Sequence, residues 1–288
     1  MTVTDHTPRH LLLATDLSAR CDRARDRAVA LARSWGARLT VVHALDGLDI
    51  PNDQPSRPTL AEASGRAKRL LRADFADVKD VAVDFQVSEG RPGDIVLDTA
   101  ADKGCDFIVT GIAGNEPLGQ SLLGSTVTKI TRHAAVPTLV VKKRPRGAYR
   151  RVTVASDLSE PSRSALDLAL NLFPKEHITL FHAFDMPLGM WVDNPEKYRE
   201  ECRSEAIEKA RAFLAGTSKG SIVRVMVADG DPAPRIADHV AQDEVDLVIA
   251  GKHDRSGFAQ ALLGSVVSAI LDEVSCDILI APSRDRST

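Results

Sequence analysis

Short apolar runs alternate with longer segments of helical periodicity along the whole chain. Residues 10–14 form a short apolar run, and residues 39–42 are continuous and β-branched, a pattern typical of a strand that is covered on both faces. Residues 22–35 carry apolar side chains at three- and four-residue spacing and end at Gly36, which predicts a helix and its stop. The same reasoning predicts strands at residues 10–14, 39–42, 81–87, 106–110, 137–141, 152–155, 178–181, 222–227, 246–250 and 278–280, and helices at residues 22–35, 59–75, 122–133, 164–173, 195–216, 232–242 and 258–274, with one more opening at Pro92.

Strands that alternate with helices across short connections predict a mostly parallel sheet with helices on both faces. The expected fold class is therefore α/β, in two tandem domains that each hold a five-stranded sheet. Ligands of such sheets bind beyond the C-terminal strand ends, where the strand order reverses. Asp16, Ala44 and Gly111 all lie at the C-terminal ends of predicted strands, so a site is expected there.

The chain contains one domain twice. The segment Ala-Thr-Asp-Leu-Ser at residues 14–18 returns as Ala-Ser-Asp-Leu-Ser at residues 155–159, and Leu-Leu-Gly-Ser at residues 122–125 returns at residues 262–265. The offsets of 141 and 140 positions nearly agree, which indicates a duplication rather than a chance repeat. Because the copies share a fold, a difference between them points to a change of function.

The totals fit two ordinary globular domains. The chain has 288 residues, of which 43% are hydrophobic and 27% charged, and half that length is enough for an independent core. We expect the domains at residues 1–144 and 150–288. The basic run at residues 142–151 then forms a solvated linker, with an acidic partner as the alternative. A net charge of -3 gives no global field that favours nucleic acid or an anionic membrane.

The sequence predicts a cytoplasmic protein without membrane insertion. The four cysteines form no C-x-x-C pair, which fits unpaired thiols in a reducing compartment. No run approaches the roughly 18 apolar residues that a spanning helix needs. Residues 1–10 lack the apolar core of a signal peptide.

A glycine-rich segment joins the fourth predicted strand of the first domain to the helix that follows. It reads Gly111-x2-Gly114-x9-Gly124-Ser125-Thr126. Glycines let the backbone approach a ligand closely, and a helix N-terminus offers unpaired N–H groups to an anion such as phosphate. The two hydroxyls would add donors. The alternative is that the glycines only turn the chain and that Gly124 and Ser125 pack or cap.

The second copy differs within this segment. It keeps Gly251, Gly264 and Ser265 but has Asp254 where the first copy has Gly114. A carboxylate beside a phosphate costs about 1 kcal/mol or more at close range. If the first copy binds phosphate, a change of function in the second copy is the simpler explanation of this difference. The alternative is that Asp254 forms an exposed turn.

These residues resemble the universal stress protein family, in its tandem form, over nearly the whole chain. Nucleotide-binding members carry G-x2-G-x9-G-[S/T], which the first copy matches in full, and an Asp after the first strand, matched by Asp16. A residue after the His at the end of their second strand lines the adenine pocket, and Ala44 follows His43 here. The second copy keeps Asp157 but departs at Asp254, which puts ATP binding there in doubt.

The resemblance implies a Rossmann-like, adenine nucleotide alpha hydrolase-like domain that binds ATP, with or without Mg²⁺. In the family the Asp faces adenine, the glycine loop holds the phosphates and the hydroxyls after the last glycine touch them. The implied binding residues are Ala14, Thr15, Asp16, Ala44, Gly111, Gly114, Gly124, Ser125 and Thr126. The resemblance also suggests an intramolecular pseudo-dimer of the two domains through their fifth strands. A protein partner of unknown identity and a further homodimer complete the expectation.

The expected role is a nucleotide-dependent regulator or sensor in the stress response, with no catalytic residue and no metal site. The P-loop, dinucleotide and serine hydrolase motifs are absent, which leaves no convincing nucleophile or base near the phosphates. Lys129 lies one helical turn past Ser125, but a solvated helix lysine explains it equally well. Two other functions stay open: a slow ATPase or nucleotidyl-transfer enzyme, and a protein-interaction module that binds no nucleotide.

Two further pairs recur in the copies. His43 and His182 occupy the same place, which favours a buried structural histidine over a catalytic or metal-binding one. Ser18 and Ser159 are the expected N-caps of the helices after the first strand of each copy.

Overall fold

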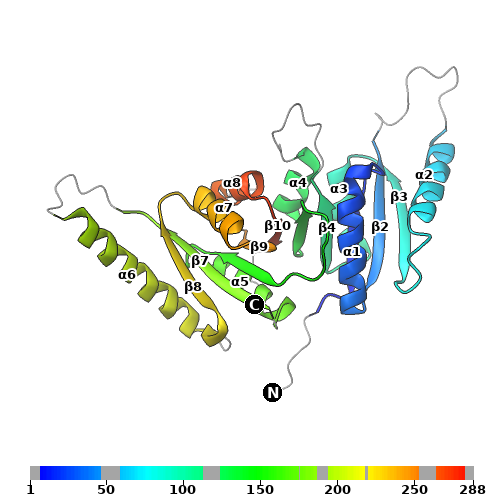
Figure 1. The fold of residues 1–288 in the computed structure, drawn as a ribbon. Coiled ribbons are helices and arrows are strands. Elements are labelled where there is room, and N and C mark those ends of the chain that lie inside the picture. Colours follow the sequence, from blue (N-terminus) through cyan, green and yellow to red (C-terminus); the bar gives the residue numbers. More distant parts are fainter. Residues whose placement is uncertain are drawn as a thin grey trace, which may run out of the picture. The chain divides into compact units, whose positions relative to one another are not determined.

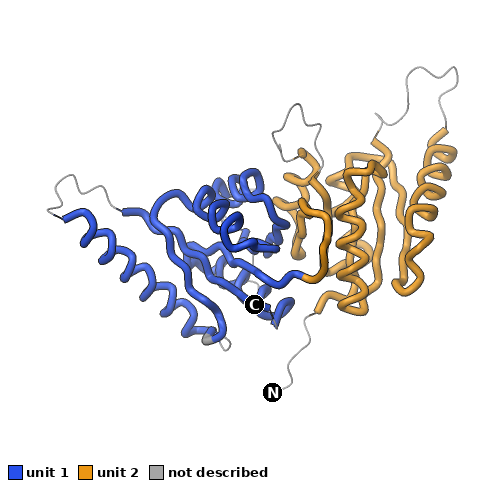
Figure 2. The backbone as a smooth tube through the Cα atoms, viewed as in Figure 1, with its two compact units in different colours: residues 1–6, 149–288 blue, residues 7–148 orange. Residues whose placement is uncertain are grey.

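A computed structural model describes residues 7–46, 59–112, 124–174, 176–186, 194–217, 220–252 and 264–282. The chain divides into two compact units with a boundary between Ala148 and Tyr149 (Figure 2). We call them the first and the second domain, and each is described by itself. The predicted limits at residues 144 and 150 stay predictions.

The first domain is a five-stranded parallel sheet with helices on both faces (Figure 1). Its elements are β1 (His10–Ala14), α1 (Asp22–Trp35), β2 (Arg38–Leu45), α2 (Leu60–Asp74), β3 (Val83–Glu89), α3 (Pro92–Asp102), β4 (Phe107–Gly111), α4 (Ser125–His133) and β5 (Thr138–Val141). The strand order is β3-β2-β1-β4-β5. Helices α3 and α4 pack on the face that presents Leu12 and Ala14, and α1 and α2 cover the other face.

The second domain repeats this plan. Its elements are β6 (Arg151–Ala155), α5 (Glu160–Leu172), β7 (His177–Phe184), α6 (Pro195–Ala215), β8 (Arg224–Asp229), α7 (Pro232–Gln242), β9 (Leu247–Gly251), α8 (Ser265–Glu273) and β10 (Asp277–Ala281). The strand order is β10-β9-β6-β7-β8, so β6 lies between β7 and β9 as β1 lies between β2 and β4. The predicted α/β fold in two tandem domains is confirmed.

Several helix and strand limits differ from those predicted. Helix α5 begins at Glu160, four residues early, because Pro161 suits the first helical turn, where its missing N–H is not needed. Strand β8 begins at Arg224 because residues Gly220–Ile222 form a 3-10 helix. The first residues of the helices predicted at 122–133 and 258–274 lie outside the described residues. No helix in the described ranges is long and apolar enough to cross a membrane.

In each domain a buried histidine makes hydrogen bonds that connect separate elements of the fold. In the first domain, Nε2 of His10 lies 2.8 Å from the hydroxyl of Thr40, and Nδ1 donates to the carbonyl of Lys103 at 3.1 Å. Burial lowers the pKa of His10 below its usual 6.5, and Arg38 acts in the same direction, which outweighs the opposing Lys103 carbonyl and Asp106. The folded domain therefore favours the neutral ring.

The second domain also contains a buried histidine that is kept neutral, but it lies on a different element. Nε2 of His239 on α7 lies 2.9 Å from the hydroxyl of Thr153 on β6, and the ring stacks on Phe181 with 5.2 Å between ring centres. Asp243 lies 2.8 Å from Nδ1. Burial still lowers the pKa of His239, although Asp243 opposes that effect.

We expect the protein to lose thermal stability as pH falls from about 6.5 towards 5. In this window the unfolded chain binds protons at these two histidines, whereas the folded chain keeps them neutral, so acid favours unfolding. The measurement is the unfolding temperature as a function of pH. The double variant His10→Gln/His239→Gln should show a flatter profile, and His133→Gln, at an exposed position, should not. A profile as steep in the double variant as in wild type contradicts this explanation.

Candidate functional site

The strand order reverses at β1, and the predicted site residues at the carboxyl ends of β1, β2 and β4 lie there. Ala14 pairs with Val42 of β2 on one side and with Thr110 of β4 on the other. The N–H of Thr15 donates to the carbonyl of Val42 at 3.0 Å, which continues the pairing beyond the strand. The structure thus brings five predicted residues to one edge of the sheet: Ala14, Thr15, Asp16, Ala44 and Gly111.

The turn after β1 is strained and is held by its own side chains. Leu17 has φ of 63°, a left-handed conformation that costs roughly 1–2 kcal/mol in a residue with a Cβ. Its N–H donates to the hydroxyl of Thr15 at 3.1 Å, and the N–H of Ser18 donates to Oδ1 of Asp16 at 2.8 Å. These hydrogen bonds fix the Asp16 carboxylate beside the carboxyl end of β1, where the strand order reverses.

The second domain builds the same turn. Leu158 has φ of 64°, and its N–H donates to the hydroxyl of Ser156 at 3.0 Å. The N–H of Ser159 donates to Oδ1 of Asp157 at 3.1 Å. Ser18 and Ser159 occupy the N-cap positions of the 3-10 helix at Ala19–Cys21 and of α5, but neither hydroxyl makes a cap hydrogen bond. The carboxylate of the Asp two residues earlier orders each turn instead.

A second donor holds each carboxylate from five residues further along. The thiol of Cys21 donates to Oδ1 of Asp16 at 3.1 Å, and the hydroxyl of Ser162 donates to Oδ1 of Asp157 at 2.7 Å. Sequence reasoning missed both residues, although the repeat alignment places Cys21 and Ser162 opposite each other. The spacing of five residues from the Asp in both copies was the available signal.

The protonation states of Cys21 and Asp16 make the Asp16 carboxylate a fixed, charged hydrogen-bond acceptor. Burial raises the pKa of the Cys21 thiol to about 12, so the sulfur keeps its proton and donates at any physiological pH. Burial also raises the pKa of Asp16, but polar contacts from Ser18 and the hydrogen bond from Cys21 outweigh it and leave the pKa below its usual 3.8. At neutral pH the carboxylate is therefore ionised and can accept an N–H from a ligand.

Two histidines, one on β2 and one on β7, make hydrogen bonds to the backbone of these turns. Nδ1 of His43 donates to the carbonyl of Thr15 at 3.0 Å, and Nδ1 of His182 donates to the carbonyl of Ser156 at 2.9 Å. Their repetition fits the structural role that the sequence favoured. Lys129 pairs with Asp94 of α3, which gives it a partner within the protein. No group of three or more possible metal ligands occurs among the described residues.

The N-terminus of α4 supplies the other half of the predicted site. Gly124 is its N-cap in extended conformation, and Ser125 and Thr126 form the start of the helix. The first N–H groups of a helix have no intrahelical partner, so they are available to an anion. Gly114 lies outside the described residues, and its predicted role stays a prediction.

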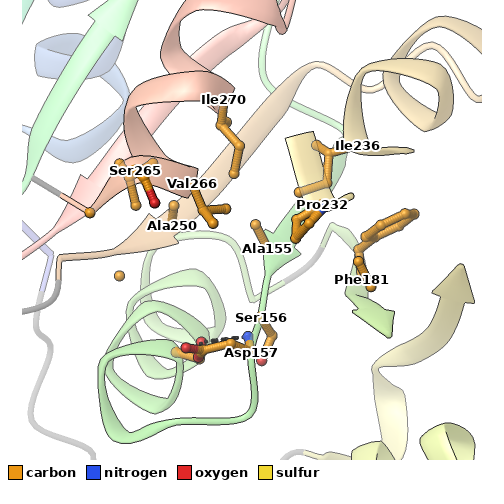
Figure 3. A pocket seen from close by; sticks show the side chains of 15 residues that line it. Ala155, Ser156, Asp157, Phe181, Pro232, Ile236, Ala250, Ser265, Val266 and Ile270 are labelled. Atoms are coloured by element: carbon orange, nitrogen blue, oxygen red, sulfur yellow. Dashed lines mark hydrogen bonds between the residues drawn. The ribbon is translucent and has the colours of Figure 1, made fainter. Parts of the chain in front are cut away.

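The counterparts of these residues in the second domain surround one cavity (Figure 3). Its volume is about 550 Å³, and Asp157, Gly251, Gly264 and Ser265 all line it. Gly251 is required on steric grounds, since a Cβ there would lie 2.1 Å from the carbonyl oxygen of Pro161. The Asp after the first strand and the start of the last helix therefore belong to a single site in this domain.

Comparisons with known proteins agree with the duplicated fold. A sequence profile described as "Universal stress protein family" matches residues 7–142 and 148–282. A universal stress protein of Mycolicibacterium smegmatis is 24% identical over 308 residues, which cover 95% of this chain and 97% of that protein. A Thermus aquaticus protein named "Universal stress protein in QAH/OAS sulfhydrylase 3'region" is 36% identical over 138 residues, which cover 46% of this chain and 97% of its own.

Solved structures share the fold of the whole chain. The crystal structure of a universal stress protein from Archaeoglobus fulgidus has a TM-score of 0.69 at 16% identity and covers 96% of this chain and 98% of its own. That of a functionally unknown protein, PA1789 from Pseudomonas aeruginosa, has a TM-score of 0.69 at 18% identity and covers 99% and 96%. At this identity the likeness concerns the fold alone.

We expect Cys21→Ala to raise the pKa of Asp16, because it removes a donor to the ionised carboxylate. Cys21→Ser should keep the pKa low, since Ser162 makes the equivalent bond in the second domain. The measurement is an NMR titration of the side-chain carboxyl carbon of Asp16, with Asp157 as the internal control. Identical Asp16 titrations in the two variants would show that the thiol does not position the carboxylate.

Proposed function

Because the chain belongs to the universal stress protein family, with one family domain in each half, we propose that it is an ATP-binding regulator whose first domain holds the nucleotide. The observation that carries this proposal is the ionised Asp16 carboxylate, fixed by Ser18 and Cys21 where the strand order reverses. An acceptor fixed in that crevice suits the exocyclic amine of adenine.

The phosphate end of the proposed site is the start of α4. Ser125 and Thr126 occupy its first turn, where hydroxyls and unpaired N–H groups favour an anion. Ala44, next to the end of β2, and Gly111, at the end of β4, are buried on the two sides of β1. They would leave room for the base and the ribose between the two polar ends.

The regulatory part of the proposal concerns the segment between Gly111 and Gly124. Bound ATP, with or without Mg²⁺, would contact this segment, which carries Gly114, and so alter a surface that a protein partner recognises. The proposed setting is the cytoplasm. Two alternative functions differ from this proposal. Slow ATP hydrolysis or nucleotidyl transfer would consume the bound ATP, and protein interaction without nucleotide would involve no ATP binding.

The first test is the nucleotide content of the freshly purified protein, read by mass spectrometry after denaturation, together with titration of the protein with ATP. We expect saturable ATP binding and ATP that stays intact on the protein for hours. No nucleotide and no titration signal would remove the binding function. Phosphate release that Gly114→Asp abolishes would instead favour the enzyme.

The second test uses the difference between the copies. Gly114→Asp should weaken ATP binding by about fivefold or more, since a carboxylate near phosphate costs about 1 kcal/mol or more. The matched variant Asp254→Gly should not weaken it. The measurement is the dissociation constant of ATP by titration calorimetry. Equal affinity in wild type and Gly114→Asp contradicts the proposed position of the phosphates.

A further inference from the structure

The second domain has another cavity, at the amino ends of its strands. Arg151 of β6, His177 of β7 and Arg224 of β8 line it, and each is the first residue of its strand. Its volume of about 650 Å³ lies within the roughly 300–1,000 Å³ typical of small-molecule sites. The cavity that Asp157 and Ser265 line is at the carboxyl ends of the same sheet. We call the two the amino-end and the carboxyl-end cavity, and they are separate sites.

The strand register places the polar side chains of the amino-end cavity on one face of the sheet. Arg151 pairs with His177, and Thr179 pairs with Arg224. Residues two apart in a strand point to the same face, as His177 and Thr179 do, and partners in parallel register share a face as well. The two arginines and the histidine therefore project from the same side of three neighbouring strands.

In the first domain an ion pair spans the corresponding position. Lys103, the C-cap of α3, pairs with Asp84 of β3. Both residues line the cavity at the amino ends of that domain, which has a smaller volume of about 360 Å³. The cation and the carboxylate of the first domain thus neutralise each other.

In the second domain these two charges are exchanged. Asp243 occupies the C-cap position of Lys103, and Arg224 occupies the strand position of Asp84. The pair does not form again, because Asp243 lies 2.8 Å from Nδ1 of His239 instead. Among the described residues, the guanidinium of Arg224 has no hydrogen-bond or ion-pair partner. A cation without a partner therefore lines the larger cavity.

Backbone strain occurs at the edge of the same cavity. Glu244 has φ of 49°, and its counterpart in the first domain is Gly104 with φ of 60°. Glycine adopts this left-handed conformation without a Cβ penalty, whereas glutamate does not, and such strained residues concentrate at functional sites. The carboxylate of Glu244 accepts from the guanidinium of Arg151 at 2.7 Å. This bond occupies Arg151 and leaves Arg224 as the arginine that can bind a ligand.

Apolar side chains lie next to this guanidinium. Ile222 is 59% exposed and lines the cavity two residues before Arg224. Pro174 and the buried Val245 add apolar wall. A guanidinium binds a carboxylate through two parallel N–H groups, and apolar surface beside it favours a ligand that can cover that surface. The combination fits a carboxylate with an apolar body.

We propose that the amino-end cavity of the second domain binds a small carboxylic acid with an apolar body, which Arg224 and Ile222 recognise. The corresponding cavity of the first domain does not bind it, because Lys103 and Asp84 satisfy each other there. The site lies at the end of the sheet opposite the strand-order reversal, so it does not depend on ATP binding by either domain.

The test follows isoleucine and valine methyl signals of the full-length protein by NMR. Phenylacetate is the probe, and phenylacetamide is the matched uncharged compound. Phenylacetate should shift the Ile222 and Val245 signals in a saturable way and leave Ile236 and Ile270, which line the carboxyl-end cavity, unshifted. Phenylacetamide should bind about tenfold more weakly or worse, because it lacks the charge that pairs with Arg224. No saturable shift at Ile222 and Val245, or equal affinity for the two compounds, overturns the proposal.

Two variants assign the binding to Arg224. Arg224→Gln should weaken phenylacetate binding by about tenfold or more, whereas Arg203→Gln, at an exposed position of α6, should not.

The double variant Arg224→Asp/Asp243→Lys installs the charge arrangement of the first domain and should abolish saturable binding. Unchanged Ile236 and Ile270 signals in the ligand-free variants show that the second domain is folded. Arg224→Gln that binds phenylacetate as tightly as wild type contradicts the proposed site.

Discussion

Parallel pairing of one strand on both of its edges is the constraint on which each domain depends. β1 pairs with β2 and β4, and β6 pairs with β7 and β9. The connections on the two sides of this strand leave in opposite directions, which opens a crevice outside the carboxyl ends of the strands at this point. Whatever follows the central strand is thereby placed in a crevice, next to the ends of its two neighbours.

The strained turn makes use of that position. A leucine in left-handed conformation, which is unfavourable for a residue with a Cβ, occurs at Leu17 and again at Leu158. Both copies keep this conformation because the turn positions an Asp carboxylate, which two hydrogen-bond donors hold in place. The thiol of Cys21 and the hydroxyl of Ser162 do the same task with different chemistry, which shows that the geometry rather than the atom type is maintained.

The two copies share one scaffold and differ in single side chains around it. Sheet order, turn and carboxylate are common to both, whereas the surface at the start of the last helix changes from Thr126 to Val266. A change of one hydroxyl at a helix N-terminus leaves the fold intact because the side chain is partly exposed.

The sequence by itself determined the order of helices and strands, the duplication and the α/β fold, because periodicity and glycine or proline punctuation are local properties. It also located Asp16, Ala44 and Gly111 at strand ends, since each follows a recognisable apolar run. It placed Ser18 and Ser159 at helix starts but did not show that the preceding Asp makes the hydrogen bond there, because that choice depends on backbone angles that residue types do not specify. Only the tertiary structure decided the donors to the carboxylates, the cavity of the second domain and the pair of His239 with Thr153, 86 residues apart. Such contacts depend on how distant segments are packed in three dimensions, and packing distances are not encoded in the spacing of residues along the chain.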